Sequence, residues 1–177
     1  MVEGTPETTA LSIYADGLAG LTDSETSRLR FGNATFYFTC RIIRICMKLN
    51  IPVVLENPSS SLMWHANALA LLTRASSAHV CDLDQCQFGT PWQKRTRFAT
   101  WGVGPLDRIA LRCDGRGGIC SRTRQRHVIL SGQSPFGCKY TALAAAYPSQ
   151  LCDSLAKLIR NAMLGKTQQA MAALISR

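Results

Sequence analysis

The sequence predicts an α/β fold, and three observations point to it. Residues 53–55 form a short, apolar run, rich in β-branched side chains, directly after a break at residues 50–52, as is typical of a buried parallel strand. A helix is predicted to follow and to end near residue 73. Further strands are predicted over residues 78–83 and 97–101. Strand, helix and strand in this order, with short connections, indicate βαβ units and a parallel sheet.

Helices are expected on both sides of this region. The Thr-Asp-Ser-Glu stretch at residues 22–25 predicts a helix start, because it offers a capping hydroxyl and acids in the first turn. An amphipathic helix is predicted over residues 33–49. Residues 102–126 are rich in Gly and Arg and are expected to form a loop. The remaining predicted elements are a strand over residues 127–130 and helices over residues 139–147, 149–164 and 166–175.

Length and composition fit a single folded domain. The chain has 177 residues, of which 46% are hydrophobic and 18% charged, so its composition is not that of a disordered protein. We expect residues 1–21 to be an irregular lead-in, residues 22–165 to form the domain and residues 166–177 to form a C-terminal helix. No apolar run approaches the roughly 20 residues that span a bilayer, and the acidic, polar start is not a signal peptide.

Cysteine usage points to a metal or free thiols. With no secretory signal, the eight cysteines are expected in a reducing compartment, nuclear or cytoplasmic, where disulfides are rare.

Positive charge is concentrated in one stretch. The formal net charge is +9, and residues 94–126 alone carry nine Lys and Arg against two acids. Such a concentration indicates a polyanionic partner such as nucleic acid. Arg122, Arg124 and Arg126, near the end of this stretch, are candidates for phosphate contacts.

Two places in the predicted sheet have side chains suited to chemistry. Glu56 follows the apolar strand, where open α/β sheets bind ligands, so its carboxyl could protonate a base. Capping the next helix, or pairing with a surface Arg, is an equal alternative. Arg95 and Arg97 are two residues apart at a strand start and therefore point the same way. Paired guanidinium groups suit phosphate or base-edge recognition, although a solvated basic edge is a common alternative.

Two motifs resemble those of cytosine-5 DNA methyltransferases. Residues 53–58 (VVLENP) are similar to the family's strand and Glu-Asn-Val motif, and residues 87–98 (QFGTPWQKRTRF) to its Tyr-Gly-Val-Pro-Gln-x-Arg-x-Arg motif, in the same order. Residues 59–64 (SSSLMW), directly after VVLENP, and residues 147–152 (YPSQLC) resemble the sequences of divergent members from phages, viruses and mobile elements. The resemblance covers roughly residues 30–159. It implies a partial Rossmann-like, S-adenosylmethionine-dependent methyltransferase sheet with flanking helices and a helical C-terminus.

The resemblance also implies roles for individual residues. Glu56 would hold and protonate ring nitrogen 3 of a flipped cytosine, and Arg95 and Arg97 would orient the base and the active-site loop. Asn57, Trp92 and Lys94 are the neighbours expected to contact DNA. Trp92 stands where the family has Gln, and an indole there could stack on a base.

Two parts of the family's catalytic machinery have no clear counterpart. The family's nucleophile is a Cys after a Pro, and no Pro-Cys dipeptide occurs here; Cys40 and Cys46 lie on a predicted helix, whose apolar neighbours would raise a thiol pKa. The Gly-rich residues 16–20 faintly resemble the cofactor loop. They lie only about 35 residues before Glu56, and a single βαβ unit needs about 30. We therefore expect the carboxyl-terminal portion of such an enzyme, inactive unless a complementing chain supplies the missing parts.

A further group of residues offers the donor atoms of a zinc site. These residues are Cys113, Cys120, His127 and Cys138, with Cys81 or Cys86 upstream. Thiolates and an imidazole in a loop could hold zinc tetrahedrally. The alternative is scattered thiols with one partly buried His. Zinc would give the basic loop a defined shape against DNA.

Two other functions therefore stand beside the methyltransferase-like protein. The first is a non-catalytic nucleic-acid-binding module, stabilised by zinc if the donor set holds it. The second is an adenine amino-methyltransferase, suggested by Asn57 and Pro58. This last function is disfavoured, because Ser59 and Ser60 stand where those enzymes have Pro and an aromatic residue.

Overall fold

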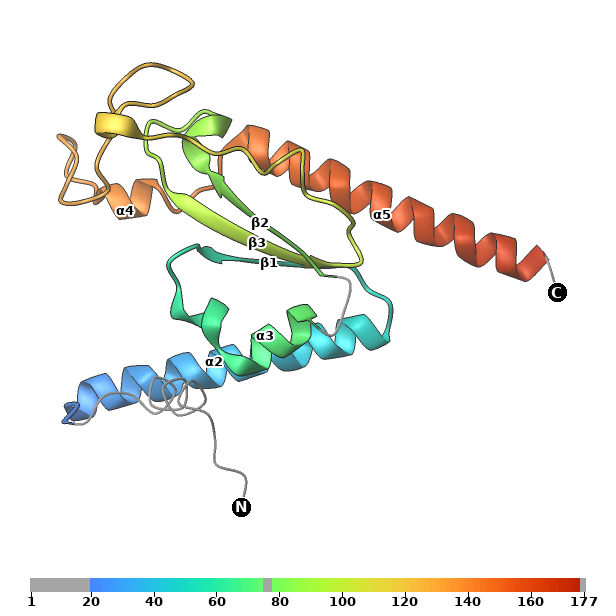
Figure 1. Ribbon diagram of the computed structural model, residues 1–177. Coiled ribbons are helices and arrows are strands. Elements are labelled where there is room, and N and C mark those ends of the chain that lie inside the picture. Colours follow the sequence, from blue (N-terminus) through green and yellow to red (C-terminus); the bar gives the residue numbers. More distant parts are fainter. Residues whose placement is uncertain (1–19, 75–77, 176–177) are drawn as a thin grey trace. The chain divides into compact units, whose positions relative to one another are not determined.

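A computed structural model describes residues 20–74 and 78–175 (Figure 1). The chain forms two compact units, and each is described by itself. In its described part, the first unit contains residues 20–51 and 61–74, and the second contains residues 52–60 and 78–175. Most of the predicted lead-in, including residues 16–19 of the Gly-rich stretch, lies outside the described residues.

The first unit is helical. It contains α2 (Asp23–Lys48), the short 3-10 helix η1 (Leu62–His65) and α3 (Asn67–Arg74). The predicted helix start is confirmed: the backbone N–H of Glu25 donates to Thr22 Oγ1 at 3.3 Å, and the backbone N–H of Thr22 donates to Glu25 Oε2 at 2.9 Å. This reciprocal pair satisfies two N–H groups at the helix N-terminus. Buried side chains of α2 and α3, which contact each other, form the core of this unit: Cys40, Ile43, Leu69 and Leu72.

The second unit contains a three-stranded sheet. Its strands are β1 (Val53–Pro58), β2 (His79–Asp84) and β3 (Arg95–Trp101), in the order β1-β3-β2. The prediction of a mixed α/β protein is confirmed, but the prediction of parallel pairing is wrong, because β3 is antiparallel to both neighbours. Parallel neighbours need a crossover of a dozen or more residues. The link from β2 to β3 is shorter, so the chain turns back antiparallel.

The strand-helix-strand order of the prediction survives in a different form. β1 and β2 both pair antiparallel with β3, so they run in the same direction, and the chain passes through η1 and α3 between them. They are not neighbours, because β3 lies between them. On their own, these three strands therefore do not form a Rossmann-like sheet.

The segments after the sheet also differ from the prediction. Residues 127–130 form no strand, since the N–H groups of His127 and Val128 donate to two separate partners, the carbonyls of Gly118 and Pro91. The helix expected over residues 139–147 is only α4 (Tyr140–Leu143). The two expected C-terminal helices are one, α5 (Ser149–Ile175), because a single Gly165 weakens a helix without ending it.

The core of the second unit lies between the sheet, the following loop and the N-terminal half of α5. Figure 1 shows α5 running past the sheet and extending beyond it. The buried cluster is Leu83, Phe88, Phe98, Leu106, Ile109 and Leu151, with Leu155 and Leu158 of α5 packed against it. Among the helices of the described residues, none is long and apolar enough to cross a bilayer.

Candidate metal centre and basic loop

Three cysteines and one histidine converge in the second unit. The side-chain donor atoms of Cys86, Cys113, Cys120 and His127 all lie within 4.8 Å of one another. Cys86 lies in the 3-10 helix η2 (Gln85–Phe88) directly after β2, and Cys120 follows η3 (Arg116–Gly118). We call this group the Cys3His cluster.

The geometry and burial of the Cys3His cluster fit tetrahedral zinc. Zinc bonds of about 2.3 Å to sulfur and 2.0–2.1 Å to nitrogen, at the tetrahedral angle, separate the two ligand atoms by about 3.6 Å. Cys113 Sγ and His127 Nε2 are 3.7 Å apart. The three cysteines are 0–4% exposed. Four protein ligands in a closed site are characteristic of structural rather than catalytic zinc.

Local hydrogen bonds explain why the loop brings its ligands together. The N–H of Cys120 donates to the carbonyl of Gln125 at 2.8 Å, and the N–H of His127 donates to the carbonyl of Gly118 at 2.7 Å. The chain reverses between them through Arg124, which has a positive φ of 60°. Gly118 also has a positive φ, of 74°, which suits a residue without a Cβ. The result is a tight turn with Cys120 on one side and His127 on the other.

Two hydrogen bonds tie the loop to β2 and to η2. Asp84, at the end of β2, accepts a hydrogen bond on Oδ2 from the N–H of Cys113 at 2.8 Å. Arg122 donates from Nε to the carbonyl of Cys86 at 2.8 Å. These contacts link the loop that carries Cys113 and Cys120 to the segment that carries Cys86.

The thiols differ in how easily they ionise. Burial raises the pKa of Cys120. Hydrogen bonds from the backbone and side chain of Thr123 have the opposite effect and contribute to a net pKa of about 7. Burial also opposes ionisation of Cys113, yet hydrogen bonds from Ser121 bring its pKa below the usual value. In contrast, burial and the neighbouring Cys113 and Cys120 raise the pKa of Cys86 to about 12. Two thiols that ionise readily beside a third that does not are a natural site for a dication.

These pKa values predict how zinc affinity depends on pH. Zinc must displace the proton of Cys86 throughout the neutral range, so the affinity should rise at least tenfold per pH unit. Below pH 7 Cys120 must lose a proton as well, so the dependence should become steeper. In the metal-free chain the lowered pKa values of Cys113 and Cys120 stabilise the folded state near the usual thiol pKa, and this contribution is lost as the pH falls towards 7, whereas the raised pKa of Cys86 destabilises the folded state above the usual thiol pKa. Competition with a coloured zinc chelator at pH 6, 7 and 8 measures the slope, and an affinity that does not change with pH would contradict the assignment.

The Cys3His cluster differs from the predicted ligand set at one position. The structure brings together Cys113, Cys120 and His127 as expected, but Cys86 takes the place predicted for Cys138. Cys138 is exposed and lies in a separate turn, where its carbonyl accepts from the N–H of Ser134 at 2.8 Å. Cys81, the other upstream candidate, points into the apolar core, and burial raises its pKa to about 11.

Arg95 and Arg97 point the same way, as predicted, but they contact acids of the neighbouring strand. Arg95 pairs with Asp84 at 3.1 Å, and Arg97 holds Asp82 through two hydrogen bonds of 2.6 and 3.0 Å. Arg112 bridges the two carboxylates at 3.2 and 3.3 Å. The hydrogen bond from Arg97 lowers the pKa of Asp82. Arg95 and Arg97 therefore stabilise the pairing of β2 with β3, and Arg112 fixes the segment directly before Cys113.

Glu56 has a specific partner. It lies on β1 opposite Phe98, and its Oε2 accepts a hydrogen bond of 2.5 Å from the hydroxyl of Tyr147. Burial, followed by the hydrogen bond to Glu56, raises the pKa of Tyr147 above its ordinary value. Lys94 Nζ lies 5.7 Å from the centre of the Tyr147 ring. These three side chains form a polar group on the second unit.

The remaining predicted DNA contacts lie in different surroundings. Asn57 stands opposite Arg97 in the sheet register. Trp92 is half-buried, and its indole Nε1 has no hydrogen-bond partner within the described part of the chain. Arg124 and Arg126 are exposed, whereas Arg122 also braces the carbonyl of Cys86.

The two cysteines considered as nucleophiles, Cys40 and Cys46, lie on α2 of the first unit. Cys40 is buried in the first unit, and burial raises its pKa, as the sequence suggested. A raised pKa disfavours the thiolate that a nucleophile requires.

Comparisons with protein-family models, with curated proteins and with solved structures find no match for this chain.

Proposed function

We propose that this protein is a nucleic-acid-binding module whose basic loop is held in shape by one zinc ion. The observation that carries the proposal is the convergence of Cys86, Cys113, Cys120 and His127, whose donor atoms lie within 4.8 Å of one another in a buried site. When bound, zinc would supply cross-links between η2 and the loop. The four residues would act as structural ligands and take no part in chemistry.

The distribution of arginines supports nucleic acid as the partner. Arg116 lies between Cys113 and Cys120, while Arg122, Arg124 and Arg126 lie between Cys120 and His127. Fixing the ligands therefore fixes the backbone that presents these side chains. Within the described residues, the acids that pair with arginine are Asp82 and Asp84, and neither Arg124 nor Arg126 takes part. Exposed, unneutralised guanidinium groups suit the phosphate backbone.

The double variant Arg124→Gln/Arg126→Gln tests this role. We expect the affinity for DNA or RNA to fall about tenfold near physiological salt, and the slope of log affinity against log salt to decrease by about two. Arg122 is left intact because it also holds the carbonyl of Cys86. Fluorescence anisotropy with labelled oligonucleotides over a salt series measures both quantities.

The matched control removes the same charge elsewhere. Arg28→Gln/Arg41→Gln changes two exposed arginines of α2 in the first unit. We expect the control to bind within about twofold of the unaltered chain. Equal losses in the two double variants would show that net charge, and not the loop, governs binding.

A second candidate is the carboxyl-terminal portion of a cytosine-5 DNA methyltransferase-like protein. The observation that favours it is the direction of the strands: β1 and β2 run the same way with β3 reversed between them. Sheets of mixed direction are common among large α/β sheets, so three strands with the middle one reversed are compatible with one end of a larger, mainly parallel sheet. In this proposal Glu56 contacts the pyrimidine, positioned by the hydroxyl of Tyr147.

A complementing half would have to supply the nucleophile and bind S-adenosylmethionine. Calorimetry of this chain with S-adenosylmethionine separates the possibilities. Tight binding by the chain alone would contradict the half-domain proposal. In a complemented enzyme, Glu56→Gln should abolish methylation and leave DNA binding intact, whereas in a purely binding module it should change neither measurement.

A further inference from the structure

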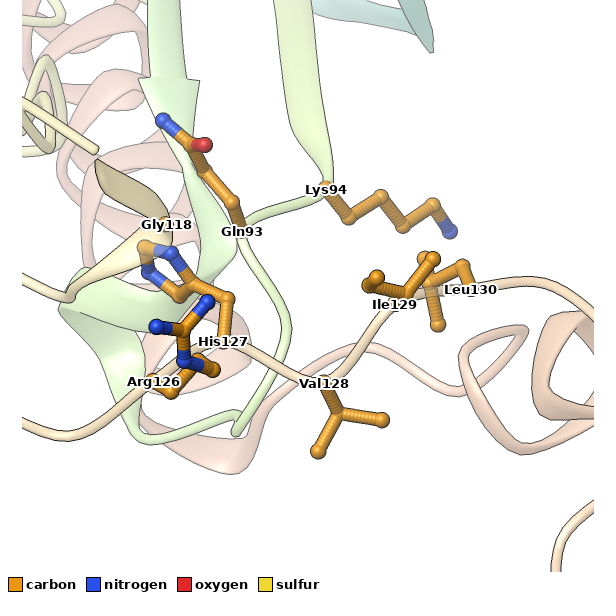
Figure 2. A pocket seen from close by; sticks show the side chains of 8 residues that line it. All are labelled: Gln93, Lys94, Gly118, Arg126, His127, Val128, Ile129 and Leu130. Atoms are coloured by element: carbon orange, nitrogen blue, oxygen red, sulfur yellow. The ribbon is translucent and has the colours of Figure 1, made fainter. Parts of the chain in front are cut away.

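A pocket of about 290 Å³ lies next to the Cys3His cluster in the second unit. It is lined by Gln93 and Lys94, from the turn before β3, and by Gly118 and residues 126–130. His127 belongs to both the pocket and the cluster. Figure 2 shows Arg126 and His127 on one side of the pocket and Lys94 with Ile129 and Leu130 on the other.

The pocket has a cation on either side. Lys94 Nζ donates to the carbonyl of Ala144 at 2.8 Å, which fixes the position of the ammonium group without neutralising its charge. Arg126 is exposed, and its guanidinium lies next to Gly118: a Cβ at that glycine would be 3.9 Å from Nη1 of Arg126. Neither cation forms an ion pair with an acid of the described residues. The pocket is therefore suited to an anionic group.

Three neighbouring apolar side chains also line the pocket. Val128, Ile129 and Leu130 line it beside the two cations. Ile129 is 77% exposed, so a large apolar side chain stands uncovered at the pocket. A ligand with an anionic end and a flat apolar face would contact both kinds of surface.

We propose that this pocket binds a single nucleotide of a single-stranded nucleic acid, with the base against Val128 and Ile129 and the two phosphates that flank it on opposite sides, at Lys94 and Arg126. The inference rests on the proposed nucleic-acid-binding function and specifies the form of its ligand. The volume is at the lower limit of small-molecule pockets, which suits one nucleotide. A base stacked and paired in a duplex cannot enter such a pocket, whereas an unpaired base can.

The shared His127 links this pocket to the metal. The N–H of Val128 donates to the carbonyl of Pro91 at 2.9 Å, and the N–H of His127 donates to Gly118 at 2.7 Å, so the pocket wall is held on both sides of a metal ligand. Zinc should therefore strengthen nucleotide binding, and by linkage nucleotides should strengthen zinc binding by the same factor.

Titrating the zinc-loaded full chain with each of the four deoxynucleoside monophosphates, and following backbone amide signals by NMR, tests the inference. We expect the amides of Gly118 and of residues 126–130 to shift. Deoxynucleosides and inorganic phosphate should each bind at least tenfold more weakly than the nucleotide, because each lacks one half of the contact. Phosphate binding as tight as the nucleotide would reduce the pocket to an anion site and overturn the inference.

Ile129→Glu supplies the second test. It places a carboxylate at the pocket, on a side chain exposed enough for the fold to tolerate the change. Affinity for a single-stranded oligonucleotide should fall about tenfold, and affinity for a duplex should fall much less. Phe136→Glu, at a 92% exposed residue outside the pocket, is the charge-matched control and should stay within about twofold.

The outcomes separate this inference from the proposed function. If Ile129→Glu and Phe136→Glu behave alike while the unaltered chain binds oligonucleotides, the pocket inference is overturned and the proposed function stands. If the zinc-loaded chain binds no oligonucleotide at all, the proposed function itself fails.

Discussion

Stripping zinc from this chain is expected to lower its melting temperature by about 10 °C. The Cys3His cluster joins η2 to the basic loop. The buried side chains at this junction are Cys86, Cys113 and Cys120, so we expect the junction to depend on zinc more than on hydrophobic packing. A metal present at about 1,000 times its dissociation constant contributes about 4 kcal/mol, which corresponds to roughly 10 °C for a chain of this length.

Removing zinc should also destabilise the basic loop locally. Without zinc, Cys113 and Cys120 would be left as buried thiols with lowered pKa values beside each other, and the loop between them should open. Hydrogen exchange of the N–H groups of Cys120 and His127, which form short backbone bonds in the loop, should accelerate strongly. Differential scanning fluorimetry before and after dialysis against a chelator, with zinc restored afterwards, measures the global effect.

Two substitutions provide the controls. Cys86→Ser should reproduce most of the loss, because it removes a ligand that is 0% exposed. Cys138→Ser should change nothing, because its thiol is exposed and lies outside the cluster. A chain that melts at the same temperature with and without zinc would refute the structural role of the metal.

Replacing Asp84 by Asn should cost about 3 kcal/mol of folding free energy. The Asp84 side chain is 0% exposed and is contacted by Arg95 at 3.1 Å and Arg112 at 3.3 Å. Asn removes the charge of a buried side chain that accepts from both arginines and from the N–H of Cys113, and a hydrogen bond to a charged group typically contributes about 1.5–3 kcal/mol. Both arginines are partly exposed and screened by solvent, so we expect well under the sum of three such bonds.

The same substitution should weaken zinc binding. Asp84 Oδ2 accepts from the N–H of Cys113 at 2.8 Å, so the carboxylate positions the backbone of a metal ligand. Removing a group that hydrogen-bonds to a metal-binding residue typically lowers the metal affinity by about 10- to 100-fold. Denaturant unfolding and chelator competition on the same preparation give the two numbers.

Asp82→Asn is the matched control for Asp84. Asp82 also pairs with two arginines, Arg97 and Arg112, but its side chain is 25% exposed, and the N–H of Cys113 donates to Asp84 instead. Solvent screens such pairs, so we expect a loss of about 1 kcal/mol or less and unchanged zinc affinity. Equal effects of the two substitutions would mean that Asp84 has no special role in placing Cys113.

Local signals in the sequence predicted local structure well. The Thr22 and Glu25 pair was sufficient to place the start of α2, because both partners of the capping box lie within one turn. Alternation along β3 likewise predicted that Arg95 and Arg97 share a side. Their partners, Asp82 and Asp84, follow from the register of β2 against β3, which is set by the connection over residues 85–94 and not by the pattern within either strand.

Non-local features were the ones that sequence patterns missed. An apolar run such as residues 53–55 looks the same in parallel and antiparallel sheets, so the reversal of β3 could not be read from it. The donor count suggested a metal site, but it could not choose between Cys86 and Cys138. That choice depends on contacts from Arg122 to Cys86 and from Asp84 to Cys113, across more than one element.

The zinc X-ray absorption spectrum of the purified chain tests the central claim most directly. The Cys3His cluster predicts one zinc per chain, with three sulfur neighbours at about 2.3 Å and one nitrogen at 2.0–2.1 Å. Cys86→Ser should lose one sulfur from this shell, and Cys138→Ser should leave the spectrum unchanged. A spectrum with only oxygen and nitrogen neighbours, or a sulfur shell lost in Cys138→Ser and retained in Cys86→Ser, would contradict the account.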